Sequence, residues 1–214
     1  MYHYAGNNPI KYTDPDGRND KVSGGLPYEP EKWNGPDKGG PLVRSSELRP
    51  GDVQNYTNCY ANALDIFGFN PVTNQQLQRG ERGDSSFALQ PGSMAGLKPL
   101  TQAQITKDNV LTYVKADAKA AGFTFKETTL DAKVQKGNWK VALVIAPGGD
   151  YHWYRLNADG TWSHKRGATQ VQLKDASKQI IYDPKKADRD YTKDGGLNYS
   201  VFVGYFEVSK CSVE

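Results

Sequence analysis

The chain has 214 residues, of which 27 are Lys or Arg and 24 are Asp or Glu, so its formal net charge is only +3. A balance this close argues against a nucleic-acid-binding surface built on charge. Hydrophobic residues make up 37%, and 22 Gly and 12 Pro interrupt them, which is typical of a loop-rich domain with a modest core. The longest apolar run, residues 141–147, is far shorter than the ~20 residues of a membrane-spanning helix. We therefore expect a soluble protein without a membrane span.

The first fifty residues contain many turn-forming and helix-breaking residues and show no sustained periodicity. Within them, Asp14-Pro15-Asp16-Gly17 fits a type I turn. We expect residues 1–50 to form an extended lead segment and residues 51–214 to form the compact domain.

The lead segment also carries a recognisable motif. Residues 2–17 read YHYAGNNPIKYTDPDG, which closely resembles the signature that closes the shell of rearrangement-hotspot (RHS) repeat proteins. The resemblance implies that residues 1–50 are the end of an RHS core with a linker, and that a polymorphic toxin domain follows. It implies a secreted protein, or one delivered into a target cell by an export system. The partners it implies are the RHS shell of the parent protein, a cognate immunity protein and a protein substrate in the target cell.

Two helices are predicted after the lead segment. The first covers residues 59–67, with Thr57 or Asn58 as its N-cap. The second covers residues 107–121, where apolar residues line one side and Gly122 ends the helix.

The C-terminal third has the alternation and β-branched content of strands. The strand candidates are residues 139–146, a hairpin of residues 151–156 and 161–165, two short segments at 171–173 and 180–182, and a last strand at 199–208. Helices followed by strands predict an α+β fold, with the first helix packed on an antiparallel sheet.

Cys59 is the candidate nucleophile. It lies in the first turn of the first predicted helix, where the positive end of the helix dipole favours a thiolate, so a lowered pKa is expected. The alternative is that Cys59 is a small buried apolar residue, as free cysteines often are. Cys211 has neither a helix to cap nor a histidine nearby, and we expect it to be incidental.

Two of the three histidines lie on the predicted hairpin. If its loop is a type I turn with Gly160 in the left-handed region, Tyr154 lies opposite His164, and His152 lies diagonal to His164 on the same face. Another loop type would place His164 on the other face. The alternative to a catalytic role is a pair of core imidazoles that only satisfy hydrogen bonds.

A cysteine at a helix tip, followed about ninety residues later by a histidine on a strand, resembles papain-like thiol enzymes. The resemblance implies a papain-like α+β fold and no cofactor. The roles it implies are nucleophile for Cys59, base for His152, orienting group for His164 (or else Asn157 or Asp183), and an oxyanion donor in Gln54.

The hypothesis from these residues is a thiol peptidase, amidase, deamidase or acyltransferase that acts on a protein of the target cell. Three alternatives stay open. A nuclease would need carboxylates clustered with a lysine, and the chain does not show that pattern. A non-enzymatic binding module would use the aromatic hairpin to hold a partner. A zinc site of Cys59, His152, His164 and a carboxylate would lack the short CxxC or HxxxH pair that usually anchors the metal.

Overall fold

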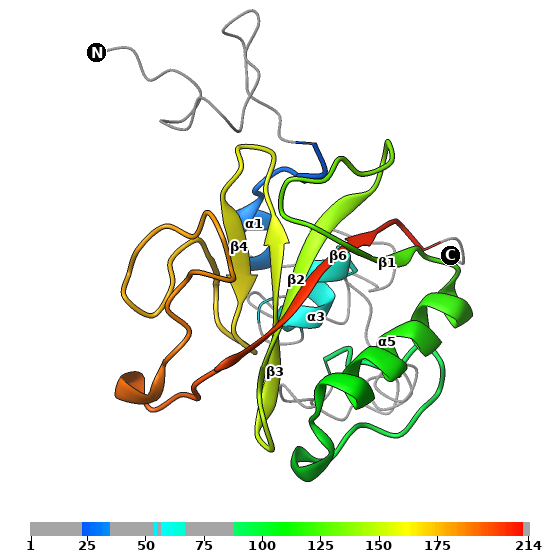
Figure 1. The fold of residues 1–214 in the computed structure, drawn as a ribbon, viewed down its shortest axis with the longest axis horizontal. Helices are drawn as coiled ribbons and strands as arrows, with labels where there is room; N and C mark the ends of the chain where they lie inside the picture. Colours follow the sequence, from blue (N-terminus) through cyan, green and yellow to red (C-terminus); the bar gives the residue numbers. More distant parts are fainter. Residues whose placement is uncertain (1–22, 35–53, 55–56, 67–87, 212–214) are drawn as a thin grey trace, which may run out of the picture.

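The computed structural model describes residues 23–34, 54, 57–66 and 88–211. Its centre is an antiparallel sheet of six strands in the order β1-β6-β2-β3-β4-β5 (Figure 1). The strands are β1 (Phe125–Thr128), β2 (Trp139–Ala146), β3 (Asp150–Leu156), β4 (Trp162–Lys165), β5 (Val171–Gln172) and β6 (Val201–Val208). The helices of the described residues are α1 (Pro30–Asn34), α3 (Cys59–Leu64), α5 (Lys107–Ala121) and the 3-10 turns Gln102–Gln104 and Thr192–Asp194. The predicted α+β class is confirmed. The shell-like signature at residues 2–17 lies outside the described residues.

β2 organises the core because all eight of its residues are buried between β3 and β6. Its apolar, partly β-branched sequence suits a strand covered on both faces. Alternate side chains point to opposite faces. Val141 and Leu143 lie on the side where α3 packs, which we call the helix face. Ala142 and Val144 lie on the opposite side among buried tyrosines, which we call the tyrosine face; its tyrosines are Tyr154, Tyr191, Tyr199 and Tyr205.

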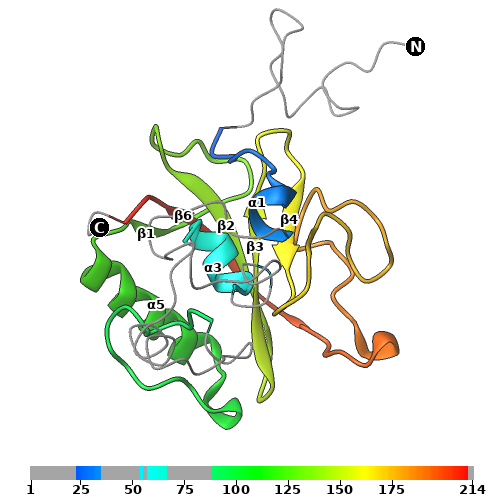
Figure 2. The same ribbon diagram turned by 180° about the vertical axis from the view of Figure 1, so that it is seen from behind.

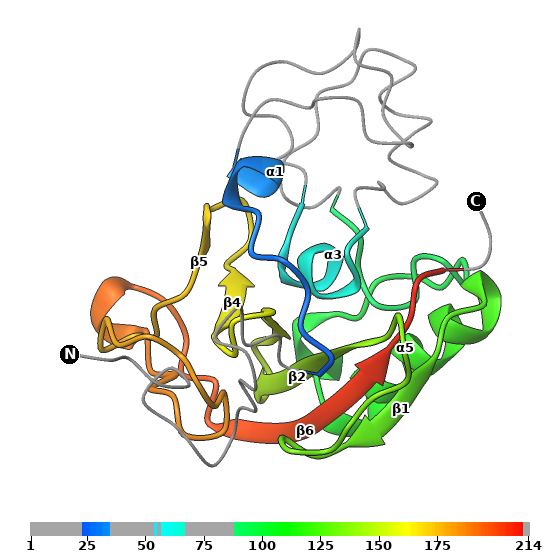
Figure 3. The same ribbon diagram turned by 90° about the horizontal axis from the view of Figure 1, so that it is seen from above.

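The helices gather on one side of the sheet. Figures 2 and 3 show α1 and α3 on the same side, with the sheet curved around α3. The indole of Trp139 donates to the Ala63 carbonyl at 2.8 Å, and the ring of Tyr60 lies 5.7 Å from that of Trp153. The helix that carries Cys59 is therefore fixed directly to β2 and β3.

α3 begins where the sequence predicts and ends earlier. The Asn58 side chain accepts hydrogen bonds from the backbone N–H groups of Tyr60 and Ala61, each at 3.0 Å. Asp65 then adopts a left-handed conformation with φ of 55°, and its carboxylate pairs with Lys32 and Arg155. The prediction of a helix to residue 67 is wrong, because these contacts from distant segments hold the chain at Asp65.

α5 covers Lys107–Ala121, as predicted, and ends at Gly122 with φ of 67°. Its buried Asp117 accepts from the Tyr60 hydroxyl at 2.9 Å and from the Gly92 N–H at 2.7 Å. These bonds connect α5, α3 and the turn near Gly92. No helix in the described part of the chain is long and apolar enough to cross a membrane.

Residues 23–34 pack on the compact domain, although the prediction assigned them to the lead segment that ends at residue 50. The Leu26 N–H donates to the Leu156 carbonyl at 3.0 Å, and Trp33 is fully buried. A Cβ at Gly25 would lie only 2.3 Å from the Asn157 carbonyl oxygen, so this close approach requires glycine. The folded unit therefore includes these twelve residues of the expected lead segment.

Candidate functional site

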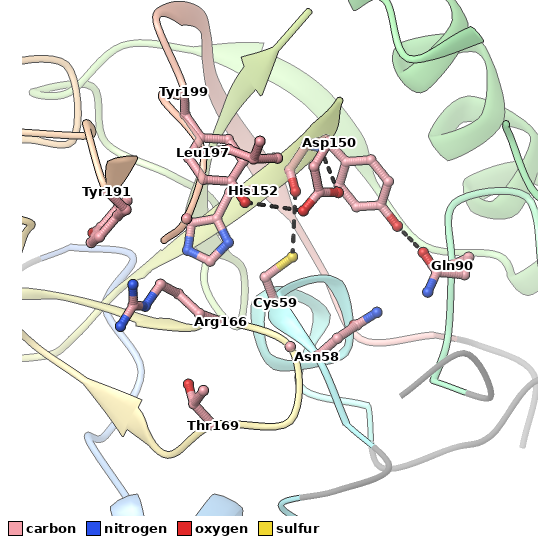
Figure 4. A pocket seen from close by; sticks show the side chains of 13 residues that line it. Asn58, Cys59, Gln90, Asp150, His152, Arg166, Thr169, Tyr191, Leu197 and Tyr199 are labelled. Atoms are coloured by element: carbon pink, nitrogen blue, oxygen red, sulfur yellow. Dashed lines mark hydrogen bonds between the residues drawn. The ribbon is translucent and has the colours of Figure 1, made fainter. Parts of the chain in front are cut away.

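A cavity of about 470 Å³ opens at the start of β3 (Figure 4). Its walls come from the start of α3, Gln90, the first three residues of β3, the segment after β4 and the segment between Tyr191 and Tyr199. Cys59 and His152 both line it. The structure thus brings the predicted nucleophile and the predicted base to one cavity.

The cavity exists because β4 is shorter than β3. β4 pairs with β3 only over Tyr154–Leu156, so it leaves the edge of residues 150–153 uncovered. Cys59 packs with the helix face, whereas the His152 ring contacts aromatic rings of the tyrosine face. The thiol and the imidazole therefore reach the cavity from opposite faces of the sheet, around this uncovered edge. Figure 4 shows the nitrogen-bearing edge of His152 facing the cavity between Cys59 and Arg166.

The predicted hairpin register is confirmed. The Asn157 N–H donates to the Thr161 carbonyl at 2.8 Å, Gly160 has φ of 84°, and Tyr154 lies opposite His164. His152 and His164 consequently share a face. Nε2 of His152 lies 2.8 Å from Nδ1 of His164, and the two rings are nearly perpendicular.

The hydrogen bonds of the two rings define their tautomers. Nε2 of His164 lies 2.9 Å from the Lys174 carbonyl, which can only accept, so this nitrogen carries a proton. Burial lowers the pKa of His164 to about 4 and that of His152 well below its usual value, so both rings are neutral near pH 7. Nδ1 of His164 must then accept the proton of His152 Nε2. This leaves Nδ1 of His152 unprotonated and able to act as a base.

The environment of Cys59 differs from the sequence-based expectation. Only 6% of the residue is exposed, and burial, with the nearby Asp150 carboxylate, raises the pKa of its thiol to about 12. Backbone hydrogen bonds from Trp153 and Tyr60, and the charge of Lys165, act in the opposite direction but are outweighed. The prediction of a lowered pKa is wrong. In this structure the thiol is protonated near pH 7 and donates to the Tyr151 carbonyl at 4.0 Å.

Lys165 connects two walls of the cavity. Its side chain is buried and donates to the carbonyls of Gln54, Thr57 and Gly167 at 2.5, 2.7 and 2.8 Å. All three ammonium protons are used, although burial lowers the pKa of Lys165 to about 7. The segment before α3 is thereby held against the segment after β4.

The other predicted candidates lie away from the cavity. The side-chain amide of Gln54 donates to the Ala168 carbonyl at 3.2 Å, and Gln54 does not line the cavity, so the predicted oxyanion role does not fit. The Asn157 side chain bonds Thr161 and Ser163 within the hairpin. Asp183 accepts from the Tyr205 hydroxyl and the Lys185 N–H. Of the three proposed orienting groups, His164 is the one that contacts His152.

Three polar residues in the walls were not identified from the sequence. The Gln90 side-chain oxygen accepts the Tyr151 hydroxyl, which leaves its amide nitrogen as a donor. Half-buried Asp150 accepts from the Tyr199 hydroxyl at 3.0 Å, and burial raises the pKa of this carboxyl. Arg166 lies over the ring of Tyr191, with 4.5 Å between Cζ and the ring centroid. Asp150 and Arg166 each lie two residues from a candidate histidine, and this spacing could have identified them from the sequence. No feature of the sequence marks Gln90 as a residue of the site.

A metal site is not supported in the described part of the chain, where no group of three or more His, Cys, Asp and Glu side chains could hold an ion. Cys59, His152 and His164 therefore do not form the zinc site that the sequence left open.

Comparison with known proteins identifies one relative. The chain is 32% identical over 181 residues to "Insoluble matrix shell protein 1" of Ruditapes philippinarum, and the match covers 85% of this chain and 88% of that protein. No protein-family model matches the chain, and no solved structure matches it.

Proposed function

The chain belongs to the family of insoluble matrix shell protein 1, and we propose that its domain is a papain-like thiol hydrolase or transferase. Cys59 is the nucleophile, His152 the base and His164 the orienting group. The observation that carries this proposal is the chain of contacts from the cavity through His152 and His164 to the Lys174 carbonyl. It leaves His152 with one free nitrogen in the cavity that Cys59 lines.

The reaction starts from a neutral thiol and a neutral imidazole, because burial disfavours the charged form of each group. Sγ of Cys59 attacks a carbonyl carbon while its proton passes to Nδ1 of His152. The tetrahedral intermediate then collapses, His152 returns the proton to the leaving group, and a thioester remains on Cys59. Water or another acceptor releases the acyl group. His164 holds the His152 ring in its tautomer throughout.

The biological setting we propose is that of a toxin. The support is the resemblance of residues 2–17 to the closing signature of RHS shells. In this setting the domain is secreted or delivered into a target cell, modifies a protein there, and is held inactive in the producer by an immunity protein. Peptidase, amidase, deamidase and acyltransferase activities all use the same pair of residues.

A second candidate function is a non-enzymatic matrix or binding role. Two observations favour it: the relative is named as an insoluble shell matrix protein, and the thiol is buried with a raised pKa. In this case His152 and His164, which bond each other, and Cys59, which bonds the Tyr151 carbonyl, are core residues.

The two functions are separated by expressing the chain in target cells. We expect the wild-type protein to inhibit growth and to change the mass of at least one cellular protein, detected by proteome-wide mass spectrometry. Cys59→Ala should lose both effects, and Cys211→Ala, the matched control, should keep them. Equal behaviour of wild type and Cys59→Ala supports the binding role.

A further inference from the structure

Arg166 is a cation in the cavity wall without an anionic partner. Among the described residues its guanidinium forms no ion pair or hydrogen bond, and its Nε is buried without an acceptor. Arg166 as a whole is half-buried, whereas the fully buried Arg155 has the Asp65 carboxylate 2.9 Å from its Nη1. A guanidinium N–H removed from water without an acceptor is costly, so a ligand oxygen that accepts from Arg166 would be stabilising.

The neighbouring charges restrict the kind of anion. The two histidines are neutral, and the ammonium of Lys165 is fully used by three carbonyls. Among the described residues that line the cavity, Arg166 is therefore the available cation. Asp150, in the same cavity, repels a doubly charged phosphate group about twice as strongly as a singly charged carboxylate at the same distance. A carboxylate carries one charge and matches the planar guanidinium in a paired hydrogen-bond geometry.

We infer that Arg166 is a specificity residue that binds a carboxylate of the substrate. The substrate class is then a peptide or amino-acid derivative with a carboxylate close to its reacting carbonyl. Because the His152 ring edge lies between Cys59 and Arg166, the carboxylate would lie across His152 from the attacking sulfur (Figure 4). The assignment of a reacting carbonyl rests on the proposed function, whereas the carboxylate site itself does not.

Two alkylating reagents of nearly equal size test the site without a known substrate. Iodoacetate carries a carboxylate, and iodoacetamide carries a neutral amide in its place. Each reaction forms an S–C bond on cysteine, breaks the C–I bond and releases iodide, and the thiol proton is lost to His152 or to water. The measurement is the ratio of the iodoacetate rate to the iodoacetamide rate at Cys59 and, as an internal reference, at Cys211, followed by peptide mass spectrometry.

We expect the ratio at Cys59 to exceed that at Cys211 by roughly tenfold, the effect of one charge-assisted interaction. Arg166→Gln should abolish this excess. The control variant Lys193→Gln removes one positive charge from an exposed position in the neighbouring turn. It should leave the excess of the Cys59 ratio over the Cys211 ratio unchanged. Arg166→Lys retains the positive charge but lacks the planar guanidinium, so it should give an intermediate ratio. It also replaces Arg166→Gln in the test if that variant does not fold.

An unchanged ratio in Arg166→Gln, an equal loss in Lys193→Gln, or a Cys59 that neither reagent reaches in the folded protein would overturn the inference. The proposed function fails separately. If His152→Ala leaves the iodoacetamide rate at Cys59 unchanged while Arg166→Gln still lowers the ratio, the carboxylate site stands and the thiol–imidazole chemistry does not.

Discussion

At the scale of single residues, burial determines the protonation of the site. Desolvation lowers the pKa of both histidines and raises that of Cys59, so the two imidazoles and the thiol are neutral in the resting site. A helix N-terminus favours a thiolate only where the sulfur stays near water. At Cys59 the sulfur is buried, and the desolvation cost outweighs the favourable backbone groups.

The first prediction concerns alkylation. Near pH 7.5, iodoacetamide should modify Cys59 more slowly than half-buried Cys211, because only the thiolate reacts and Cys59 is the more buried thiol. Peptide mapping over a time course measures both rates in one sample, and a urea-unfolded sample should show nearly equal rates. A faster Cys59 in the folded protein would mean that the sulfur is held as a thiolate, contrary to the structure.

The second prediction concerns acid. His164 has a folded pKa of about 4, below its unfolded value, so the unfolded chain binds more protons between these values. Stability should therefore fall as the pH drops from about 6.5 towards 4, by at most about 3 kcal/mol from this residue. Urea unfolding at pH 7 and pH 4.5 measures the change. His164→Gln removes the group and should show a smaller loss on acidification; an identical loss would contradict the buried neutral imidazole.

The third prediction separates two glutamines. Gln90 lines the cavity with a free amide donor, whereas the Gln54 amide is used by the Ala168 carbonyl. If the proposed chemistry holds, Gln90→Ala should lower the rate of thioester formation on Cys59 by roughly 100-fold, the low end for loss of an oxyanion donor. Gln54→Ala should change it much less. The reverse order would return the oxyanion role to Gln54.

At the scale of elements, the cavity is built by one strand ending early and by one buried lysine. β4 stops at Lys165, which exposes the edge of β3, and Lys165 then holds the segment before α3 in place. The element that carries His164 thus also positions the tip of the helix that carries Cys59.

The fourth prediction tests this connection. Lys165→Met keeps the apolar stem but leaves three carbonyls without their donor, so the free energy of unfolding should fall by about 3 kcal/mol. Exposed Lys193→Met should change it by less than about 0.5 kcal/mol. Urea denaturation of both variants measures the difference. A Lys165→Met variant as stable as the wild type would show that the three hydrogen bonds do not fix this wall.

Local signals explain which elements were predictable. α5 is capped at both ends, β2 contains the apolar run of residues 141–146, and Gly160 determines the hairpin register, so all three follow from neighbouring residues. β1 reads FKET, which shows little alternation, and it exists because it pairs with β6. Likewise, the end of α3 depends on Lys32 and Arg155, far away in the chain.

At the scale of the whole molecule, the site depends on tertiary arrangement that the sequence pattern does not contain. The predicted pair lines one cavity, but from opposite faces of the sheet, which no periodicity argument could indicate. The same limit explains the errors with Gln54 and Asp183, whose partners come from segments far along the chain. It also explains why Trp33, in the expected lead segment, is fully buried in the core.

The central claim is that Cys59 forms a thioester with the help of His152. The most direct measurement is intact-mass spectrometry after brief exposure to p-nitrophenyl acetate, with the modified residue located by peptide mapping. The account predicts one acetyl group on Cys59, absent in Cys59→Ala, retained in Cys211→Ala, and formed at least ~100-fold more slowly in His152→Ala. Acetylation of Cys59 at the same rate with and without His152, or none at Cys59 in the folded wild type, would contradict it.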